Sequence, residues 1–171
     1  MNRLQLATLL SWAGETGIQG RKRLQKVVFF LQDAGCPLGC QYTLHHFGPY
    51  SRDVADACDE MVAAGLIEEK VEPQAGITQY RYLLKQQTQE LLRQVPQGQM
   101  QAFEAIAREL ISENIWSLEL GSTILLFYRQ SGDWNDALTE ACQFKKTEPE
   151  DEKSQISLRL AQRVASQAGH L

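Results

Sequence analysis

A chain of 171 residues, 43% of them hydrophobic, is long enough to bury a core, and its net charge of −4 is not that of a strongly basic nucleic-acid-binding protein. The sequence shows no apolar run long enough to span a bilayer and no signal-peptide pattern, so we expect a cytoplasmic protein without a membrane partner. The four cysteines, Cys36, Cys40, Cys58 and Cys142, are too few for a disulfide scaffold.

The chain is predicted to begin with two amphipathic helices. Apolar residues recur at the spacing of a buried helical face over 3–13 and 21–34, and glycines interrupt the pattern between the two segments. In the second helix, Lys22 and Lys26 lie one turn apart on the side opposite the apolar face. We therefore expect these two lysines to face solvent.

A turn, a third helix and a β-hairpin are predicted to follow. Residues 42–47 are rich in aromatic and β-branched side chains, which predicts a short strand, and Gly48-Pro49 predicts a tight turn. Ser51 is a suitable N-cap for a helix that ends at Gly65. Residues 66–85 then have the pattern of a β-hairpin, with a turn at 73–76. This order of elements is that of a winged helix, in which the hairpin is the wing.

After residue 85 all patterning is helical. Helices are predicted over 88–95, 99–113, 117–131, 134–144 and 152–167. The helix over 117–131 is apolar around most of its circumference, which marks the centre of a helical core. The sequence thus predicts a mostly α, α+β fold, with a winged-helix-like unit over 1–85 and a helical extension over 86–171 packed on it as one compact domain.

Three segments carry a resemblance to a known family: Gly-Arg-Lys-Arg-Leu-Gln-Lys-Val-Val-Phe-Phe-Leu (20–31), His-Phe-Gly-Pro-Tyr-Ser (46–51) and Ala-Gly-Leu-Ile-Glu-Glu (64–69). Together they resemble the YwgA-like proteins and the related Panacea group, to which SocA-type antitoxins belong. The C-terminal region of DarG-type antitoxins is similar over the same stretch. Phe47 departs from this pattern, since tyrosine is more usual before Gly-Pro. A looser similarity covers 115–146. The resemblance implies a winged-helix-like, non-catalytic module often found in antitoxins, and it transfers no catalytic residue.

Two cysteines and two histidines raise the question of a metal. Cys36 and Cys40 precede His45 and His46, but structural zinc usually uses a tighter cysteine pair. Adjacent histidines on an extended strand point to opposite faces, so at most one of them could join the cysteines. We favour buried structural cysteines, and we predict no metal and no cofactor.

The helix after Ser51 holds the position of a recognition helix but is acidic. It carries Asp53, Asp56, Asp59 and Glu60, with Arg52 as its only cation. Carboxylates facing phosphates oppose association, so major-groove binding by this helix is disfavoured.

We therefore predict a non-enzymatic protein-binding module, such as an antitoxin or a regulatory adaptor. Its binding face is expected to comprise Tyr50, Arg52, Asp53, Asp56 and Glu60. The expected partner is a protein, such as a toxin or a nucleic-acid-acting enzyme whose basic surface the acidic face matches. A solvated acidic face without a partner is the other interpretation of the same pattern.

An alternative function is a DNA-binding transcriptional regulator. It would use the basic helix and the wing, through Arg21, Lys22, Arg23, Lys26, Lys70 and Arg81. A solvated basic face that keeps the helix soluble competes with this hypothesis. No catalytic residue is predicted, because the sequence shows no metal dyad on a helix, no serine elbow and no recognisable carboxylate pair. Homodimer formation is left open.

Overall fold

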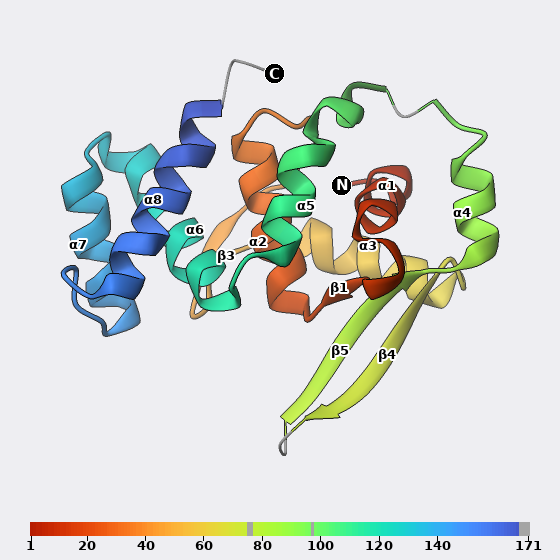
Figure 1. The fold of residues 1–171 in the computed structure, drawn as a ribbon, viewed down its shortest axis with the longest axis horizontal. Coiled ribbons are helices and arrows are strands. Elements are labelled where there is room, and N and C mark those ends of the chain that lie inside the picture. Colours follow the sequence, from red (N-terminus) through yellow and green to blue (C-terminus); the bar gives the residue numbers. More distant parts are fainter. Residues whose placement is uncertain (75–76, 97, 168–171) are drawn as a thin grey trace.

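The computed structural model describes residues 1–74, 77–96 and 98–167, and it shows an α+β fold in which helices predominate (Figure 1). Among these residues, no helix has both the length and the apolar character needed to cross a lipid bilayer. The elements in chain order are α1 (Arg3–Ala13), the 3-10 helix η1 (Gly14–Thr16), β1 (Ile18–Gln19), α2 (Arg21–Asp33), β2 (Thr43–His45), β3 (Gly48–Tyr50), α3 (Arg52–Ala63), β4 (Ile67–Gln74), β5 (Ile77–Leu84), α4 (Gln86–Leu92), the 3-10 helix η2 (Gly98–Phe103), α5 (Glu104–Ser112), α6 (Ile115–Ser131), α7 (Trp134–Lys145) and α8 (Glu152–Gln167).

Two small antiparallel sheets accompany the helices. The first has the order β1-β5-β4, and its β4–β5 hairpin pairs Ile67 with Leu84 at one end and Gln74 with Ile77 at the other. This hairpin projects away from the helices (Figure 1), while the predicted turn residues Ala75 and Gly76 lie outside the described part of the chain. The second sheet contains only β2 and β3. The wing hairpin predicted over 66–85 is therefore present. The turn predicted at Gly48-Pro49 is wrong, because the turn lies at residues 46–47 and Gly48–Tyr50 form strand β3, which pairs with β2.

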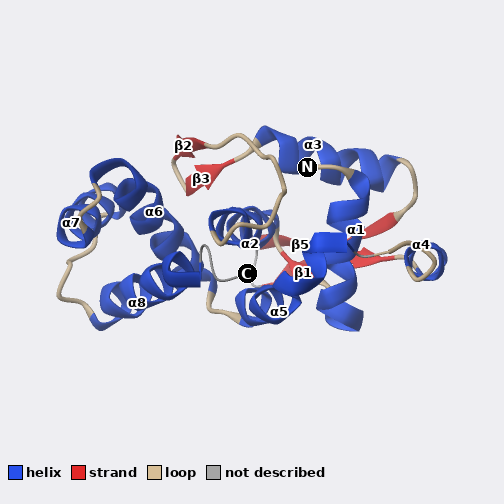
Figure 2. Ribbon diagram, turned by 90° about the horizontal axis from the view of Figure 1, so that it is seen from above, coloured by secondary structure: helices blue, strands red, loops and turns tan. Residues whose placement is uncertain are grey.

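Helix α2 lies at the centre of the molecule. Seen from above, α6, α7 and α8 form a group on one side of α2, while α1, α3 and α4 lie on the other (Figure 2). The run from Leu24 to Leu31 is buried without interruption, which requires neighbours around most of the helix. Two polar side chains, Gln25 and Lys26, belong to this buried run. Such groups are costly to bury without partners, and both form hydrogen bonds with the backbone of residues 49–51.

Helix α6 is the second central element, as its apolar circumference predicts. Gly121 allows its close approach to neighbours, because a Cβ there would lie 3.0 Å from the carbonyl oxygen of Ser157 and 3.3 Å from the ring of Phe30. The side chain of Asp133 accepts hydrogen bonds from the backbone N–H groups of Asn135 and Asp136, which confirms its predicted role as the α7 cap. Helix α6 packs against α2 and β3, so it helps to fix the position of the β2–β3 hairpin.

The other predicted helices agree with the structure except at their ends. The segment predicted as one helix over 99–113 begins as the 3-10 helix η2 and becomes α-helical only at Glu104. The helix predicted over 88–95 begins earlier and ends at Leu92. Helix boundaries depend on caps and on tertiary contacts more than on apolar spacing, which explains these shifts.

Candidate binding surface at the β2–β3 hairpin

The segment Leu24-Gln25-Lys26 of α2 holds the backbone of Gly48-Pro49-Tyr50-Ser51. The side-chain amide of Gln25 donates to the carbonyl oxygen of Ser51 at 2.8 Å and accepts from its backbone N–H at 2.9 Å. The ammonium of Lys26 donates to the carbonyl oxygen of Pro49 at 2.6 Å. These bonds satisfy backbone groups that have no neighbouring strand on this side. The two sequence segments therefore act as one structural unit.

A second glutamine of α2 repeats this arrangement seven residues later, on the same face of the helix. The side chain of Gln32 donates to the carbonyl oxygen of Cys40 at 2.9 Å and accepts from its backbone N–H at 2.6 Å. Residues 40 and 51 are thus both bound to α2 through amide pairs. The β2–β3 hairpin lies between these two anchors, which fixes its position on the helix.

Gly48 brings the hairpin into direct contact with α6. Its φ of +90° favours glycine, and a Cβ at this position would lie 2.5 Å from Oγ1 of Thr123 and 3.5 Å from Nζ of Lys26. Any larger residue would meet both the backbone penalty and this contact. Gly48 therefore lets the hairpin pack tightly between α2 and α6.

The structure corrects the predicted position of Lys26. This side chain is only 2% exposed and does not lie on a solvated basic face. Burial lowers its pKa to about 7, and the positive charges of Lys145 and Lys22 act in the same direction, while Glu119 opposes them. The prediction failed because residues that are distant in the chain, the hairpin and α6, cover the polar side of α2.

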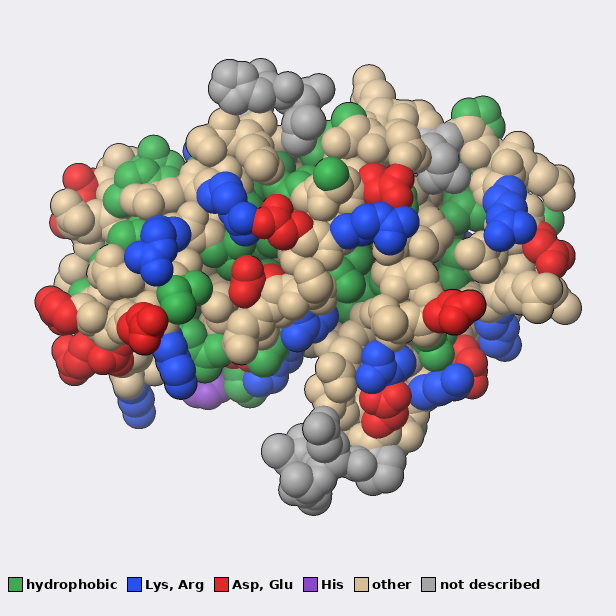
Figure 3. Space-filling view, viewed as in Figure 1, with side chains coloured by type: hydrophobic (Ala, Val, Ile, Leu, Met, Phe, Trp, Pro, Cys, Tyr) green, Lys and Arg blue, Asp and Glu red, His purple; other side chains and the backbone are tan. Residues whose placement is uncertain are grey.

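Apolar and aromatic side chains on the hairpin are nevertheless exposed. The exposed fractions are 42% for Leu44, 42% for Phe47 and 37% for Tyr50. The ring of His45 lies 5.5 Å from that of Tyr50, and the ring of His46 lies 5.0 Å from that of Phe47. We refer to these five residues as the hairpin patch. In Figure 3, histidine, basic and hydrophobic side chains gather at the lower edge of the molecule, on the side of helices α6–α8 and apart from the β4–β5 hairpin.

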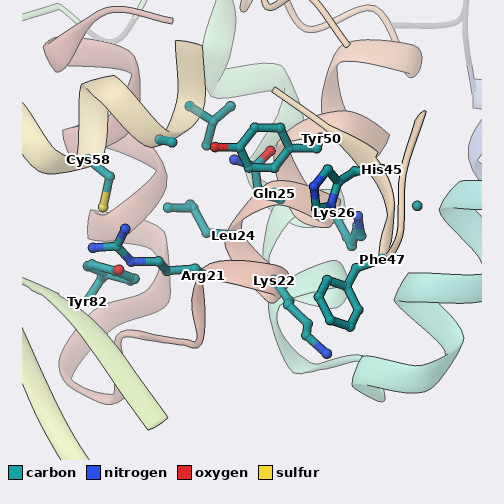
Figure 4. Close-up of a pocket in the computed structure, with 13 residues that line it drawn as sticks. Arg21, Lys22, Leu24, Gln25, Lys26, His45, Phe47, Tyr50, Cys58 and Tyr82 are labelled. Atoms are coloured by element: carbon teal, nitrogen blue, oxygen red, sulfur yellow. The ribbon is translucent and has the colours of Figure 1, made fainter. Parts of the chain in front are cut away.

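A pocket of about 170 Å³ opens beside the hairpin patch, between α2, α3 and β5. Figure 4 shows Tyr50, His45 and Phe47 on one side of it, with Cys58, Arg21 and Tyr82 on the other. Its surface is mainly apolar, and we call it the α3-side pocket. A wider groove of about 440 Å³ lies between the hairpin and helices α6 and α7, and we call it the α6-side groove. Phe47 lines both hollows.

Three charged side chains, Lys22, Glu119 and Lys145, lie next to Phe47 and His46 at the tip of the hairpin. The ammonium of Lys22 lies 3.9 Å from the centre of the Phe47 ring and 3.2 Å from Oε1 of Glu119. The ammonium of Lys145 lies 3.8 Å from Oε2 of the same glutamate and donates to the carbonyl oxygen of His46 at 3.4 Å. Glu119 is therefore shared by two lysines at the tip of the hairpin.

The predicted acidic face is only partly assembled. Arg52 and Asp56 form an exposed ion pair at 3.5 Å, and Glu60 pairs with Arg3 at 3.3 Å. Asp53 instead accepts from the backbone N–H of Gln41 at 2.7 Å, which gives it a structural role. Arg52, Asp56 and Glu60 follow one another at helical spacing on α3, beside the hairpin patch.

The residues of the predicted basic surface are engaged within the protein. Arg21 contacts Asp59 and Glu69, each at 3.1 Å, and Arg23 donates to the carbonyl oxygens of Ile111 and Glu113. On the wing, Lys70 pairs with Glu68 at 3.8 Å, and Arg81 pairs with Glu72 at 2.7 Å. With Lys22 on Glu119 and Lys26 buried, each of the six predicted cations contacts an acidic group or a carbonyl oxygen of the protein.

The four cysteines are free thiols and all are buried. Burial raises the pKa of the Cys36 thiol to about 11 and that of Cys58 to about 12. Within the described residues, no three His, Cys, Asp or Glu side chains gather in a way that could hold a metal ion. Cys36, Cys40, His45 and His46 thus do not form a metal site of that kind in the fold.

Comparison with known proteins gives the family. No family model matches the sequence. The chain is similar to the protein named "Uncharacterized protein YwgA" from Bacillus subtilis (strain 168), with 32% identity over 123 residues that cover 72% of each chain. The chain belongs to the YwgA-like family. This membership confirms the YwgA-like part of the predicted resemblance.

In this YwgA-like chain, sequence reasoning found the two segments that form the site but missed the residues that join them. Gln25 was not predicted as part of the site, because only Leu24 separates Gln25 and Lys26 from the charged residues 21–23, and the apolar run starts at Val27. The apolar spacing of the helix therefore carried no signal that Gln25 is buried. Glu119, Thr123 and Lys145 gave no signal, since their roles depend on how α6 and α7 meet the hairpin.

Proposed function

We propose that this protein is a non-enzymatic protein-binding module that uses the hairpin patch as its contact surface. The order of its elements and the β1-β5-β4 sheet order support a winged-helix frame with β4–β5 as the wing. The resemblance to Panacea and DarG-type sequences supports a role as an antitoxin or regulatory adaptor. The partner is then a protein, such as a toxin or a nucleic-acid-acting enzyme.

The observation that carries this proposal is an exposed aromatic hairpin held by buried polar bonds. Leu44, Phe47 and Tyr50 remain accessible, while Gln25 and Lys26 fix the backbone beneath them. Exposed apolar groups that cluster mark interaction sites more often than scattered ones do. A rigid backbone lowers the entropy lost on binding, and aromatic anchors supply much of the binding energy in protein interfaces.

Tyr50 connects this surface with the face predicted on α3. Its ring stands at the end of β3, and Arg52, Asp56 and Glu60 continue from it along the exposed side of the helix. These charged residues fit the polar rim of an interface whose centre is the hairpin patch. Asp53 is left out of the proposed surface, because it is bound to the backbone of Gln41.

The same contacts argue against the DNA-binding alternative. Phosphate recognition needs cations that are free to exchange counterions for phosphates. Here Arg21, Lys70 and Arg81 already pair with carboxylates, and Lys26 is buried. The acidic α3 would also face the duplex. Lys26 has the lowered pKa that is common in active sites, but its bond to the Pro49 carbonyl gives it a structural role.

The experiment is quantitative affinity capture with the tagged full-length protein from a lysate of its source cells. We compare the wild type with Phe47→Asp and Tyr50→Asp, and Val71→Asp is the matched control because this exposed apolar residue lies on the wing. A specific protein should be captured by the wild type and the control and lost with both hairpin variants, even after nuclease treatment. Equal capture by all variants, or capture that nuclease abolishes, would overturn the proposal.

A further inference from the structure

The hairpin patch lies between two hollows of different shape. The α3-side pocket is bounded by α2, α3 and β5, whereas the α6-side groove is bounded by α6 and α7, and Phe47 lines both. An extended segment that crosses the hairpin at Phe47 could therefore place one side chain in each hollow. Successive side chains of an extended chain point to opposite sides, which suits this arrangement.

Each hollow fits a large apolar side chain. The α3-side pocket has a volume of about 170 Å³ and an apolar wall that includes Leu24, Val54 and Ala55. A protein cavity of about 150 Å³ with such a wall takes up benzene. The α6-side groove is larger and adds two aromatic residues, Trp116 and Phe144. Aromatic rings in such hollows gain energy from both burial and ring contacts.

The charge around these hollows is opposite to that of the protein as a whole. Their linings contain Arg21, Lys22, Lys26, Lys145 and Lys146 but only one acid, Glu119. Arg21 is balanced by Asp59 and Glu69 from outside the linings, and Lys26 is buried. The linings then contain three further lysines, Lys22, Lys145 and Lys146, against the single carboxylate of Glu119, in a chain whose net charge is −4.

This local excess of positive charge favours a ligand that carries a carboxylate. Lys22 is about half exposed and stands over Phe47, while Lys146 is exposed at the edge of the α6-side groove. Lys22 contacts the Phe47 ring and Lys146 lines the same groove as Phe47, so both lysines are candidate partners for a carboxylate that enters beside this ring. A basic segment would instead be repelled, so charge complementarity determines the sign of the occupant.

We propose that the hairpin patch docks an extended segment of the partner protein in which an acidic residue lies close to large apolar residues. The apolar side chains occupy the α3-side pocket and the α6-side groove, and the carboxylate contacts Lys22 and Lys146. This inference rests on the proposed function, since it specifies the chemistry of the partner at the same surface. It separates the hairpin patch from the acidic side of α3, which meets a different part of the partner.

The test is selection from a random dodecapeptide library displayed on phage. The immobilised full-length protein is the bait, and binders retained by Phe47→Ala are discarded, so that the remaining peptides depend on the hairpin. These peptides should be enriched in Asp or Glu within a few positions of Phe, Trp or Leu. Because the library contains all spacings, no particular sequence has to be guessed.

The most enriched peptide is then synthesised, labelled and titrated by fluorescence anisotropy. Lys146→Glu should weaken its binding about tenfold or more, while the matched change Lys70→Glu on the wing should leave it unchanged. Nuclear magnetic resonance shifts should move at Leu44 to Tyr50, Lys22 and Phe144. An enrichment of basic or uncharged peptides would overturn the inference, and so would an unchanged affinity of Lys146→Glu.

A competition experiment with an oligonucleotide tests whether the surface binds nucleic acid instead of a peptide. If a labelled single-stranded (dT) oligonucleotide displaces the peptide and binds more tightly, the surface is a nucleic-acid site and the inference is wrong. If lysate capture depends on Phe47 but no acidic peptide is selected, this inference fails while the proposed function stands. If capture is independent of the hairpin, the proposed function fails, whatever the library yields.

Discussion

The side chain of Gln25 binds both backbone groups of Ser51, with its amide donating at 2.8 Å and accepting at 2.9 Å. The amide thus takes the place that a neighbouring β-strand would occupy beside Ser51. Both residues are buried, so water does not replace these bonds when they are lost. This pair, together with Lys26 and Pro49, connects the two most distinctive segments of the sequence.

Replacing Gln25 with Met should destabilise the protein by about 2–4 kcal/mol. The variant keeps the volume of the side chain but leaves the N–H of Ser51 buried without its partner, at about 1–3 kcal/mol. It also removes one of two bonds to the Ser51 carbonyl oxygen, which keeps the N–H of Ala55 at 3.4 Å, at a further cost of about 1 kcal/mol. Urea unfolding followed by circular dichroism measures the loss. The matched change Gln86→Met removes an exposed contact with Glu90 and should cost less than about 0.5 kcal/mol. Similar losses for the two variants would contradict the role given to Gln25.

Gly48→Ala should be more harmful than Gly39→Ala, although both glycines have positive φ. At Gly39 an added Cβ meets open space, so only backbone strain of about 1–2 kcal/mol is expected. At Gly48 the Cβ would lie 2.5 Å from Oγ1 of Thr123, which adds overpacking of about 1–3 kcal/mol. Unfolding free energies of the two variants give the comparison. Removing the hydroxyl in Gly48→Ala/Thr123→Ala should recover part of the loss, and no recovery would mean that Thr123 is not the obstacle.

The buried amine of Lys26 predicts a specific pH dependence. Its folded pKa is about 7, mainly because of burial, against 10.5 in an unfolded chain. Between these values the unfolded state binds more protons, so stability rises with pH. The stability that the neutral Lys26 amine contributes is fully present above pH 10.5 and is lost as the pH falls through 7. From about pH 6.5 to about pH 8.5, the free energy of unfolding of the wild type should rise by about 2 kcal/mol relative to that of Lys26→Met.

Urea unfolding of both proteins at several pH values checks this prediction. The comparison stops near pH 8.5 because thiols such as Cys36, with a raised pKa, begin to act in the opposite direction above it. Taking the difference between wild type and variant removes contributions that the two proteins share. A constant difference across the range would show that Lys26 keeps its proton, paired with Glu119 despite its burial.

Much of the secondary structure could be predicted because it depends on local patterns. Apolar spacing located α1 and α2 to within a residue, and the N-cap at Asp133 fixed the start of α7. The pairing of β1 with β5 could not be found in this way. Strand β1 contains only Ile18 and Gln19, too few residues for an alternating pattern, and its place in the sheet comes from contact with Tyr82 and Arg81.

The site was less accessible to sequence reasoning, since helical spacing cannot show what covers a helix. Lys26 stands on the side of α2 that spacing alone assigns to solvent, and residues 48–49 of the hairpin cover it. Arg21 forms ion pairs with Asp59 and Glu69, which lie about 40–50 positions further along the chain. The sequence around Arg21 therefore looked basic, because the carboxylates that neutralise this residue are not near it in the sequence. The sequence shows the aromatic residues around Gly48, but their exposure depends on how the hairpin packs on α2 and α6, which the sequence pattern does not show.

The paired state of the basic residues predicts weak binding to mixed duplex DNA. Affinity at low salt should be in the range of non-specific binding, and it should almost disappear at moderate salt. Fluorescence anisotropy with a labelled duplex at two salt concentrations measures this. Lys22→Glu and Lys70→Glu are suitable variants because both side chains are about half exposed, whereas Lys26→Glu would place a charge in the core. Tight, salt-dependent binding that Lys22→Glu removes would restore the DNA-binding alternative.

The cysteines should be inert to alkylation in the folded protein. All four are buried, and burial holds the pKa of the Cys36 and Cys58 thiols near 11 and 12, so little thiolate forms at neutral pH. Iodoacetamide at pH 7.5 should leave the native chain unmodified in intact mass spectrometry, while the same reaction in denaturant should add four groups. Rapid modification of Cys36 or Cys40 in the native protein would show that the segment leading into the hairpin opens, and the anchors at Gln25 and Gln32 would then be weaker than their geometry indicates.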